Sequence, residues 1–457
     1  MRALELFRKW NANPLFLPGA VLVALLGLAH AVMPIAADDA INIPHVYSVT
    51  LREWVHHQFS GWSSRFIIDT ISWPLYHVFD VWRVLNVLVF LVLFIFLTKL
   101  LALNNSRLTA WMGMFTVLAL PFGRDAWAGF LATSITYYWP LAAGVVVAYG
   151  VKKVLTGHRL HVWEVLGYLA ALLMAIDQEQ SNVFVLGMLL LTALYCLVVR
   201  RQRPPVLLVT FAVLAAARMV LALLAPGPAV RRGVEIARFF PDFGTRSVTE
   251  RLQMGFSPTL GYLFGRPERI MLALTILVLC TILVTQRHWF YRLLGAVPLA
   301  AVIVTGWAEI LRDITGIDTG RLMFFGGIVE RRNMIDLRTY DNLFNYVPIL
   351  FFGVVWVCLI IAVYLIHENR PDVGWFSAGV LVAGFVSRFV VGFSPTGFDS
   401  GARTFTYAYL ALLMVLFLAA QRLIELRPKR TVYWAGTLGV LALGSTWTLA
   451  VVITSGW

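Results

Sequence analysis

Long uncharged segments recur along the whole chain, and they limit the kinds of fold that it can adopt. Each runs for about 17 to 23 mostly apolar residues, enough to cross a hydrocarbon layer of roughly 30 Å as a helix. Hydrophobic residues make up 60% of the chain and charged residues only 13%, which is more apolar surface than a soluble core can bury. We therefore predict an all-α, polytopic integral membrane protein. It has about thirteen predicted transmembrane helices, near residues 15–36, 82–103, 108–122, 139–151, 162–176, 183–199, 204–224, 269–286, 293–310, 347–366, 374–390, 404–421 and 431–453.

Basic residues are concentrated in every second loop, starting with the N-terminal segment that carries Arg2, Arg8 and Lys9. Short loops rich in Lys and Arg stay in the cytoplasm. These loops hold 18 of the 37 basic residues and 5 of the 24 acidic ones, so the whole net charge of +13 lies on that side. We therefore predict a cytoplasmic N-terminus and a first apolar segment that is retained as a helix, not cleaved as a signal peptide. The charge indicates topology, and we expect no nucleic-acid partner.

The predicted outer side differs from the inner side in two ways. Its segments 37–81, 121–138, 225–268 and 311–346 are long enough to carry a site, whereas the inner loops are short. All five lysines fall on the inner side, so every outer basic residue is an arginine, whose planar fork suits phosphate and carboxylate groups. Codon bias would produce the same pattern. We treat residues 1–426 as one transmembrane module that includes these outer segments, and 427–457 as a C-terminal transmembrane helix.

Two adjacent aspartates, Asp38 and Asp39, stand where the first apolar segment ends. A helix end that meets water would explain one acidic residue. The loop that follows is suited to lie on the bilayer, because Thr50 and Glu53 have capping-box spacing and precede an apolar helical face. A second interfacial helix is predicted in "RFIIDTISWPLYHVF", with an interruption at Pro74. Two such helices would hold the aspartates near the lipid head groups, where a carboxylate could act as a general base.

Further outer motifs combine cationic, aromatic and polar side chains. Arg65 in "GWSSRF" suits either an interfacial arginine and tryptophan belt or a contact to phosphate or sugar. The motif "TSITYYWPL" suits either an aromatic belt or sugar stacking, and "AIDQEQSN" is a polar connection between two spans. Two Gly- and Pro-rich turns carry outer arginines, of which Arg388 ends an apolar segment and is costly there unless it is paired or snorkels. The predicted sugar- or acceptor-binding residues are Tyr137, Tyr138, Trp139, Asp177, Glu179 and Gln180.

A metal site is an alternative use of the first outer loop. His45, His56, His57 and His77 accompany the acidic residues there, but no pair has a zinc-ligand spacing, and adjacent histidines point to different helix faces. We expect no metal and no cofactor. The sequence also shows no Gly-rich nucleotide loop and no signature of a Ser or Cys nucleophile.

The motifs "ADDA", "GWSSRF", "ITYYWPL", "DQEQSN", "LAPGPAVRR" and "SPTGFDSGARTF" together resemble the GT-C superfamily of lipid-sugar-dependent glycosyltransferases. Within that superfamily they look like bacterial proteins related to the O-antigen-modifying glucosyltransferases of the GtrII type. The expected topology agrees, with a first span that ends in Asp-Asp, an outer loop with two interfacial helices, and ten or so further spans. The likeness covers most of residues 15–420. One departure is Ser64 before Arg65, where the family pattern has glycine.

This resemblance implies a GT-C fold and transfer of a monosaccharide from a polyprenyl-phosphate donor to a hydroxyl of a surface glycan or glycolipid, such as an O-antigen or teichoic acid. The reaction would occur at the outer face of a bacterial cytoplasmic membrane, with inversion and without a metal. A donor-synthesising enzyme and a flippase would act in the same pathway. The family's first-loop base corresponds to Asp38 or Asp39. The residues that would hold the donor phosphate are Arg65, Arg231, Arg232, Arg388 and Arg403.

Two other classes of membrane protein are alternatives. A transporter or lipid flippase should have charged residues deep inside several spans and a repeat that relates its halves, and the sequence indicates neither. A membrane acyltransferase should have a catalytic histidine in the membrane. His30 is the one histidine well inside a predicted span, and the sequence shows no evident partner for it.

Overall fold

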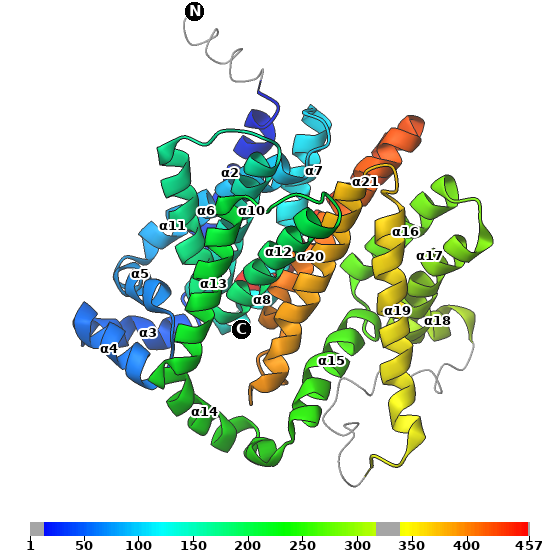
Figure 1. The fold of residues 1–457 in the computed structure, drawn as a ribbon. Helices are drawn as coiled ribbons and strands as arrows, with labels where there is room; N and C mark the ends of the chain where they lie inside the picture. Colours follow the sequence, from blue (N-terminus) through cyan, green and yellow to red (C-terminus); the bar gives the residue numbers. More distant parts are fainter. Residues whose placement is uncertain (1–12, 317–338, 456–457) are drawn as a thin grey trace, which may run out of the picture. The chain divides into compact units, whose positions relative to one another are not determined.

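The computed structural model describes residues 13–316 and 339–455, which form helices and turns with no strand among them (Figure 1). Nine helices in this part of the chain are long and apolar enough to cross a membrane, or ten if the bent pair Val248–Phe264 and Arg269–Thr285 counts as one span. The prediction of an all-α, multi-pass membrane protein is thus confirmed. Each of the thirteen predicted segments matches a helix. Three of these, α2 (Phe16–Ala31), α7 (Arg107–Leu118) and α11 (Val162–Asp177), are shorter than a typical span.

The chain divides into two compact units, which we describe separately. Unit 1 comprises Met1–Arg231 and Leu438–Trp457, and unit 2 comprises Arg232–Thr437. Most of the predicted outer segment 311–346 lies outside the described residues.

Unit 1 contains the first outer segment and the spans that follow it. The segment 37–81 folds into three short helices, one more than predicted, and the third of them continues through Pro74 to His77. A π-helical turn, η2, joins α9 to α10 without a break, so that Phe130–Leu155 forms one candidate span. The remaining elements are α3 (Asp38–Tyr47), α4 (Leu51–Gly61), α5 (Phe66–His77), α6 (Phe79–Leu101), α8 (Phe122–Asp125), η1 (Ala126–Ala128), α9 (Phe130–Thr133), η2 (Ser134–Tyr138), α10 (Trp139–Leu155), α12 (Glu179–Val198) and α13 (Val206–Leu224).

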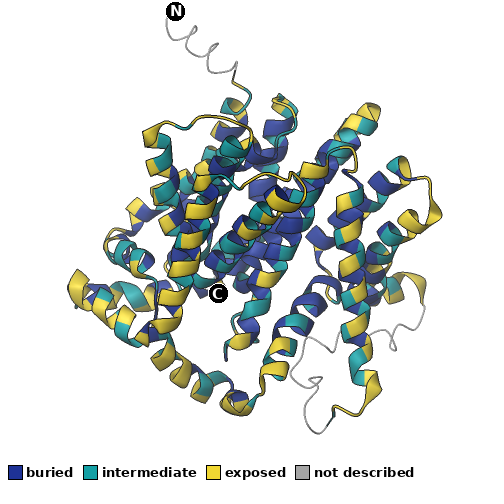
Figure 2. Ribbon diagram, viewed as in Figure 1, coloured by how far each residue is buried: buried dark blue, intermediate teal, exposed yellow. Residues whose placement is uncertain are grey.

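Unit 2 contains the later spans, and the unit boundaries fall inside α14 (Pro226–Phe239) and α22 (Thr431–Ser455). Its most buried span is α21 (Thr406–Leu426), which is dark along most of its length in Figure 2. The other elements are η3 (Pro241–Thr245), α15 (Val248–Phe264), α16 (Arg269–Thr285), α17 (Trp289–Ala301), η4 (Val302–Gly306), α18 (Ala308–Thr315), η7 (Leu343–Asn345), α19 (Tyr346–Leu365), α20 (Pro371–Phe389), η8 (Val390–Phe393), η9 (Ala402–Phe405) and η10 (Pro428–Arg430).

The predicted cytoplasmic loops of unit 1 meet at one end of its helices. The Nζ of Lys152 donates hydrogen bonds to the carbonyl oxygens of Lys99 at 3.1 Å and Leu100 at 2.6 Å. Arg200, from the next basic loop, donates to the carbonyl oxygen of Leu155 at 3.0 Å. Three loops that alternate with the outer segments thus share one end, as the charge pattern predicts. Lys and Arg near the last helical turn also complement the C-terminal carbonyl groups.

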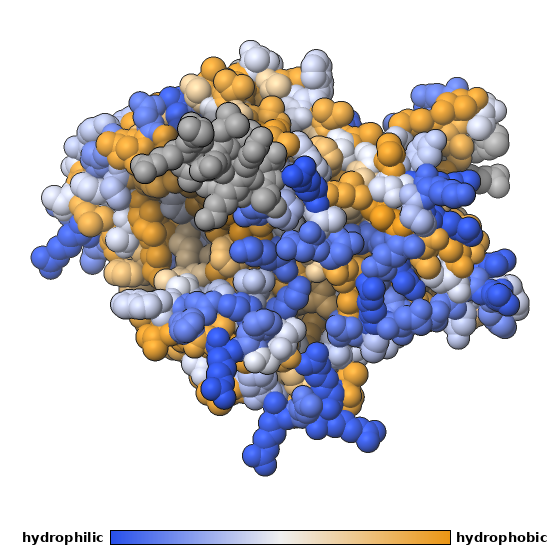
Figure 3. All heavy atoms as spheres, turned by 90° about the horizontal axis from the view of Figure 1, so that it is seen from above, coloured by the Kyte–Doolittle hydropathy of each residue, from blue (hydrophilic) through white to orange (hydrophobic). Residues whose placement is uncertain are grey.

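Unit 2 shows the same grouping. Arg370 pairs with Glu425 at 2.9 Å, and Gln286 donates to Glu368 at 2.8 Å, which joins three basic loops. In the space-filling view, hydrophilic side chains gather in places, with hydrophobic side chains among and around them (Figure 3). The helix flanks stay apolar where they are exposed. In α13 of unit 1, for example, only 22% of the most apolar 18-residue stretch is buried inside the protein, which suits a helix surface that faces lipid.

Two glycines allow a very close approach of backbones in unit 2. A Cβ added to Gly392 would lie 2.2 Å from the backbone nitrogen of Gly255, and a Cβ added to Gly255 would lie 2.2 Å from the carbonyl oxygen of Phe389. Because the opposing atoms are backbone, no side-chain rotation can make room for a larger residue. The turn after α20 is therefore held directly on α15.

We expect Gly392→Ala to destabilise the folded protein by about 1–3 kcal/mol or more, because overpacking at this contact must displace backbone. The melting temperature of purified protein, followed by tryptophan fluorescence, measures the effect. Gly244→Ala is the control, since nothing lies within 4 Å of a Cβ at Gly244. Equal melting temperatures for the Gly392 variant and the wild type would contradict this packing.

Candidate active site

Asp39 is fully buried and closes the start of a membrane-spanning helix. Its two carboxylate oxygens accept hydrogen bonds from the backbone N–H groups of Leu131 and Ala132, both at 2.9 Å. These donors belong to the first turn of Phe130–Leu155, where backbone N–H groups have no partner inside the helix. Asp39 therefore caps this helix from a distant part of the chain, and in its ionised form the negative charge complements the helix dipole.

The backbone on both sides of this contact is unusual. Gly129 precedes the capped helix with φ +114°, and a Cβ there would lie 2.9 Å from the Asp39 carboxyl carbon. Ala37 precedes the aspartates with φ +49°, a conformation that costs free energy for any residue with a side chain. The chain therefore accepts strain at Ala37 in order to direct Asp39 into the protein.

Burial makes the ionised form of Asp39 unfavourable. The pKa of its carboxyl is raised to about 7, mainly by burial and to a smaller extent by the charge of Asp38, while the backbone donors Ala132 and Leu131 oppose the rise. Burial is the main cause that raises the pKa of the Tyr76 hydroxyl, and the charge of Asp39 is the next. Tyr76 therefore lies close to Asp39. The Tyr76 hydroxyl accepts a hydrogen bond from the Asn42 amide at 2.9 Å.

Asp38 differs from its neighbour in being exposed at the start of α3. Adjacent residues in the first turn of a helix point in different directions. One carboxylate of the pair is thus directed into the protein, and the other lies at the surface. This difference separates two residues that the sequence could not tell apart.

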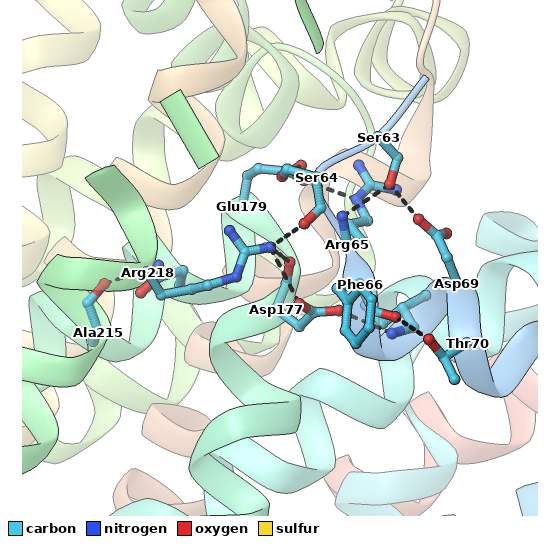
Figure 4. A network of polar contacts seen from close by, with 12 residues as sticks. Ser63, Ser64, Arg65, Phe66, Asp69, Thr70, Asp177, Glu179, Ala215 and Arg218 are labelled. Atoms are coloured by element: carbon cyan, nitrogen blue, oxygen red, sulfur yellow. Dashed lines mark hydrogen bonds and ion pairs between the residues drawn. The ribbon is translucent and has the colours of Figure 1, made fainter. Parts of the chain in front are cut away.

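The motifs "GWSSRF" and "DQEQSN" meet in unit 1 and form a polar network (Figure 4). The Arg65 Nε donates to Glu179 at 2.8 Å, and the Ser64 hydroxyl donates to the other oxygen of the same carboxylate at 2.9 Å. Ser64, the departure from the family pattern, therefore supplies a hydrogen bond that glycine could not. Burial lowers the pKa of Arg65, but the charge of Glu179 outweighs it, so the guanidinium remains protonated.

A second ion pair, between Arg218 and Asp177, holds the same loop through its backbone. Asp177 accepts a hydrogen bond from the backbone N–H of Ile68 at 2.9 Å and pairs with Arg218 at 3.1 Å. Arg218 also donates to the carbonyl oxygen of Ser64 at 2.5 Å (Figure 4). Residues 64–68 are thus bound through their backbone to side chains of α11 and α13.

Asp69 forms the other side of this loop. Its carboxylate accepts a hydrogen bond from the Ser63 hydroxyl at 2.6 Å, and the Ser63 oxygen in turn accepts one from the Arg65 backbone N–H at 2.9 Å. Burial raises the pKa of Asp69 to about 7, although the Ser63 hydrogen bond and the Arg65 charge both oppose the rise. The carboxylates around this loop therefore have different electrostatic environments.

A third motif, "LAPGPAVRR", packs on the same loop. A Cβ added to Gly227 would lie 2.8 Å from the backbone nitrogen of Ser63 and 2.7 Å from the carbonyl oxygen of Phe59, so glycine is required for this approach. The Arg231 guanidinium lies over the Trp62 ring at 5.0 Å. Arg65 and Arg231, both predicted phosphate contacts, thus flank one short loop.

The predicted sugar-binding aromatic residues have unequal exposure. Tyr137 is half-buried near Arg65, but Tyr138 is buried and donates its hydroxyl hydrogen bond to Asp125 at 2.9 Å. Trp139 donates its indole N–H to Asn86 at 2.9 Å. The polar groups of Tyr138 and Trp139 therefore bond to other side chains within unit 1. Of the three aromatic residues, only Tyr137 lies beside the polar loop.

Gln180 is also buried, one residue beyond Glu179 in α12. His30 has a partner that the sequence did not reveal, since its Nε2 lies 2.7 Å from the Asn86 amide nitrogen. Together with Trp139 it forms a buried polar chain inside the bundle. These contacts give His30 a structural role. His30 is the residue that would serve as the catalytic histidine if the protein were a membrane acyltransferase.

Three of the predicted phosphate-binding arginines lie in unit 2. Arg232 is exposed, and its guanidinium lies 5.4 Å from the Phe243 ring centre. Arg388 is buried, lies over the Phe405 ring at 4.6 Å and donates to the carbonyl oxygen of Gly397 at 3.0 Å. Arg403 precedes α21 in the same turn region. The two arginine-bearing turns of unit 2 meet where Phe240 and Phe398 pack, with ring centres 6.2 Å apart.

The histidines of the first outer loop are distributed around α3 to α5. The rings of His45 and His57 lie 5.8 Å apart, and His77 packs on Trp73 and Tyr47. Within residues 13–316 and 339–455, no group of three or more His, Cys, Asp and Glu side chains could hold a metal ion.

Comparison with protein-family models, with characterised proteins and with solved structures finds no match to this chain.

Arg218 is the one member of the polar network that sequence reasoning missed. It lies inside an apolar segment, at residue 13 of the 19-residue helix α13, where a charged side chain requires a partner. That rule, applied to every predicted span, would have identified it. Its partner Asp177 could be identified only after the fold placed α11 beside α13.

Asp39→Asn should make stability less dependent on pH. Because the folded-state pKa of about 7 exceeds the ordinary value of 3.8, the stabilising effect of the protonated carboxyl is present at low pH and is lost as pH rises through 7. The loss between pH 4 and pH 8 approaches about 4 kcal/mol, from 1.36 kcal/mol per unit of pKa. Melting temperatures of the wild type and variant between pH 4 and 8 test this. Asp38→Asn is the comparison variant and should keep most of the pH dependence of the wild type, because the charge of Asp38 is only a minor cause of the raised pKa of Asp39; an unchanged profile for Asp39→Asn would contradict the assignment.

Arg218→Gln should loosen residues 62–70, because it removes the partner of a buried carboxylate, at a cost of about 3 kcal/mol. Hydrogen exchange of the amides in this loop, followed by mass spectrometry, should become faster. The matched control is Lys153→Gln, which breaks an ion pair with Glu164 at the opposite end of unit 1. Similar exchange in the loop for both variants would show that Arg218 does not hold it.

Proposed function

We propose that this protein is a GT-C-type membrane glycosyltransferase, which transfers a monosaccharide from a polyprenyl-phosphate donor to a hydroxyl of a surface glycan or glycolipid. The observation that carries the proposal is the convergence of three distant motifs on one loop of unit 1. Residues 62–65, 177–179 and 227–231 bring two arginines and several carboxylates together beside the segment that presents Asp38. The sequence resemblance selected these same motifs.

In the proposed reaction Asp38 is the general base. The acceptor hydroxyl oxygen attacks the anomeric carbon, and its proton passes to the Asp38 carboxylate. The bond between the anomeric carbon and the phosphate oxygen breaks, and its electron pair leaves with the polyprenyl phosphate. Direct displacement inverts the anomeric centre. Asp39 is not available for this step, since it is fully buried and both of its oxygens already accept backbone hydrogen bonds.

The guanidinium groups of Arg65 and Arg231 would stabilise the charge that develops on the leaving phosphate. Arg65 uses its Nε for Glu179, which leaves the two terminal nitrogens for a bidentate contact to phosphate oxygens. Glu179 then sets the plane of the guanidinium without occupying its outer edge. Phosphate is already a stable leaving group at neutral pH, so the mechanism requires no metal.

The setting that supports this function is the outer face of a bacterial cytoplasmic membrane, with the basic loops in the cytoplasm. Each unit gathers its basic loops at one end, which is the pattern that the positive-inside rule predicts. The proposed finer architecture is a GT-C fold with about thirteen spans, in which α2, α7 and α11 also cross the membrane. The donor would be synthesised and flipped by other proteins.

Asp38→Asn should reduce sugar transfer by about 100-fold or more, because loss of a general base typically costs two to four orders of magnitude. The assay follows a labelled hexose from a polyprenyl-phosphate donor to envelope glycans, with purified protein in lipid nanodiscs. Asp39→Asn is the matched control: it changes stability but should retain most of the transfer at pH 7. Full activity of a folded Asp38→Asn variant would exclude Asp38 as the base.

A further inference from the structure

A compact aromatic cluster forms at the junction of α14, η3 and α15 in unit 2. Phe240, Phe243 and Met254 are buried there, and Ile236 and Phe398 pack against them. Phe243 has no exposed surface at all. The cluster lies in the segment 225–268, which the charge pattern assigns to the outer side.

Three guanidinium groups stand over these rings. Those of Arg232 and Arg251 lie 5.4 and 5.0 Å from the centre of the Phe243 ring, and that of Arg246 lies 5.7 Å from the Phe240 ring. A guanidinium over an aromatic face keeps its N–H groups in its own plane, so the edge of each group remains able to donate hydrogen bonds. The rings therefore act as a platform that fixes the positions of three cations.

The three cations have one carboxylate partner between them in the described part of the chain. Arg246 pairs with Glu250 at 2.9 Å, but Glu250 is also the capping residue of α15 and accepts two hydrogen bonds from Ser247. Arg251 is half-buried, and its one hydrogen bond there is a long one, 3.4 Å, to the carbonyl oxygen of Phe243. The exposed Arg232 has no carboxylate partner in this region.

The Nε groups of Arg246 and Arg251 are buried and have no hydrogen-bond partner among the residues that the structure describes. A half-buried cation without an anion is costly, and a bound anion would remove that cost. Phosphate fits best, because it offers three acceptor oxygens and up to two negative charges to several guanidinium groups at once.

We propose that Arg232, Arg246 and Arg251, held on Phe240 and Phe243, form a binding site for a phosphate group. At the boundary between lipid and water the source is a polyprenyl phosphate, a phospholipid head group or free phosphate, and the three share the chemistry that the site recognises. The site does not depend on sugar transfer. It would hold a phosphate ester in a protein with no transferase activity as well.

Binding to full-length protein tests the site directly. Wild-type protein in phosphatidylcholine nanodiscs is titrated with a long-chain polyprenyl monophosphate, with phosphatidylglycerol incorporated at increasing fractions, or with inorganic phosphate. We expect saturable binding of at least one probe, weakened about tenfold or more by Arg251→Gln, since charge-assisted hydrogen bonds are lost. The probe whose binding is weakened most by Arg251→Gln identifies the source of the phosphate.

Arg238→Gln is the matched control, because Arg238 is an exposed arginine of the same segment that stacks on Phe239 at 4.8 Å. It removes the same charge outside the cluster and should leave affinity unchanged. If Arg251→Gln fails to fold, the exposed Arg232→Gln replaces it, with Arg251→Lys to retain the charge without the planar fork. The proposal is overturned if no probe saturates, if the cluster variants bind as the wild type does, or if Arg238→Gln loses as much affinity.

The Asp38→Asn variant separates this inference from the proposed function. It should bind each phosphate probe with wild-type affinity whether or not it transfers sugar. Phosphate binding that depends on Arg251 in a protein without transferase activity would support the site and contradict only the enzymatic proposal.

Discussion

Two buried carboxylates that accept hydrogen bonds from backbone N–H groups fix the first outer segment, and the rest of the candidate site depends on them. Asp39 belongs to that segment and reaches across to cap the helix that starts at Phe130. Asp177 belongs to α11 and reaches back to the N–H of Ile68 in the segment. The segment is thus held in both directions by charge-assisted hydrogen bonds to groups that do not change conformation easily, because helix termini and ordered turns supply them. This attachment lets Asp38 and Arg65 occupy defined positions even though they lie on connections between spans.

The sequence was sufficient to predict the helical class and the alternation of basic loops, since apolar length and charge act locally. Three of the motifs that it singled out also meet in unit 1. It could not rank Asp38 against Asp39, because the difference arises from the distant N–H groups of Leu131 and Ala132. Tyr138 and Trp139 look like ligands for a sugar in a linear motif, but Tyr138 is buried, and the polar groups of the two side chains donate hydrogen bonds to Asp125 and Asn86 inside the protein. These outcomes depend on tertiary contacts, and no spacing within the motif encodes them.

The surroundings of the arginines could not be predicted from the sequence either. Residue type alone indicated phosphate recognition, but the fold distributes the predicted cations between two units and gives them different surroundings. Arg65 is held by a carboxylate and retains two terminal nitrogens, Arg388 is buried against an aromatic ring, and Arg251, which no motif singled out, combines a ring contact with an unsatisfied Nε. A guanidinium without a carboxylate is the more informative observation, because pairing is the ordinary way to offset burial of a charge.

The placement of Arg218 also bears on the choice between an enzyme and a transporter. A charged residue inside a span ordinarily indicates a path for substrate or ions. Arg218, however, is tied to the carbonyl oxygens of Ser64 and Asp177, which are loop and helix-end groups, so its charge is used at the end of the helix. The buried chain of hydrogen bonds through Trp139, Asn86 and His30 contains no charged partner and ends at the backbone carbonyl oxygen of Leu26. In unit 1 these polar groups therefore fasten helices to loops, which favours a rigid platform for chemistry over a pathway through the protein.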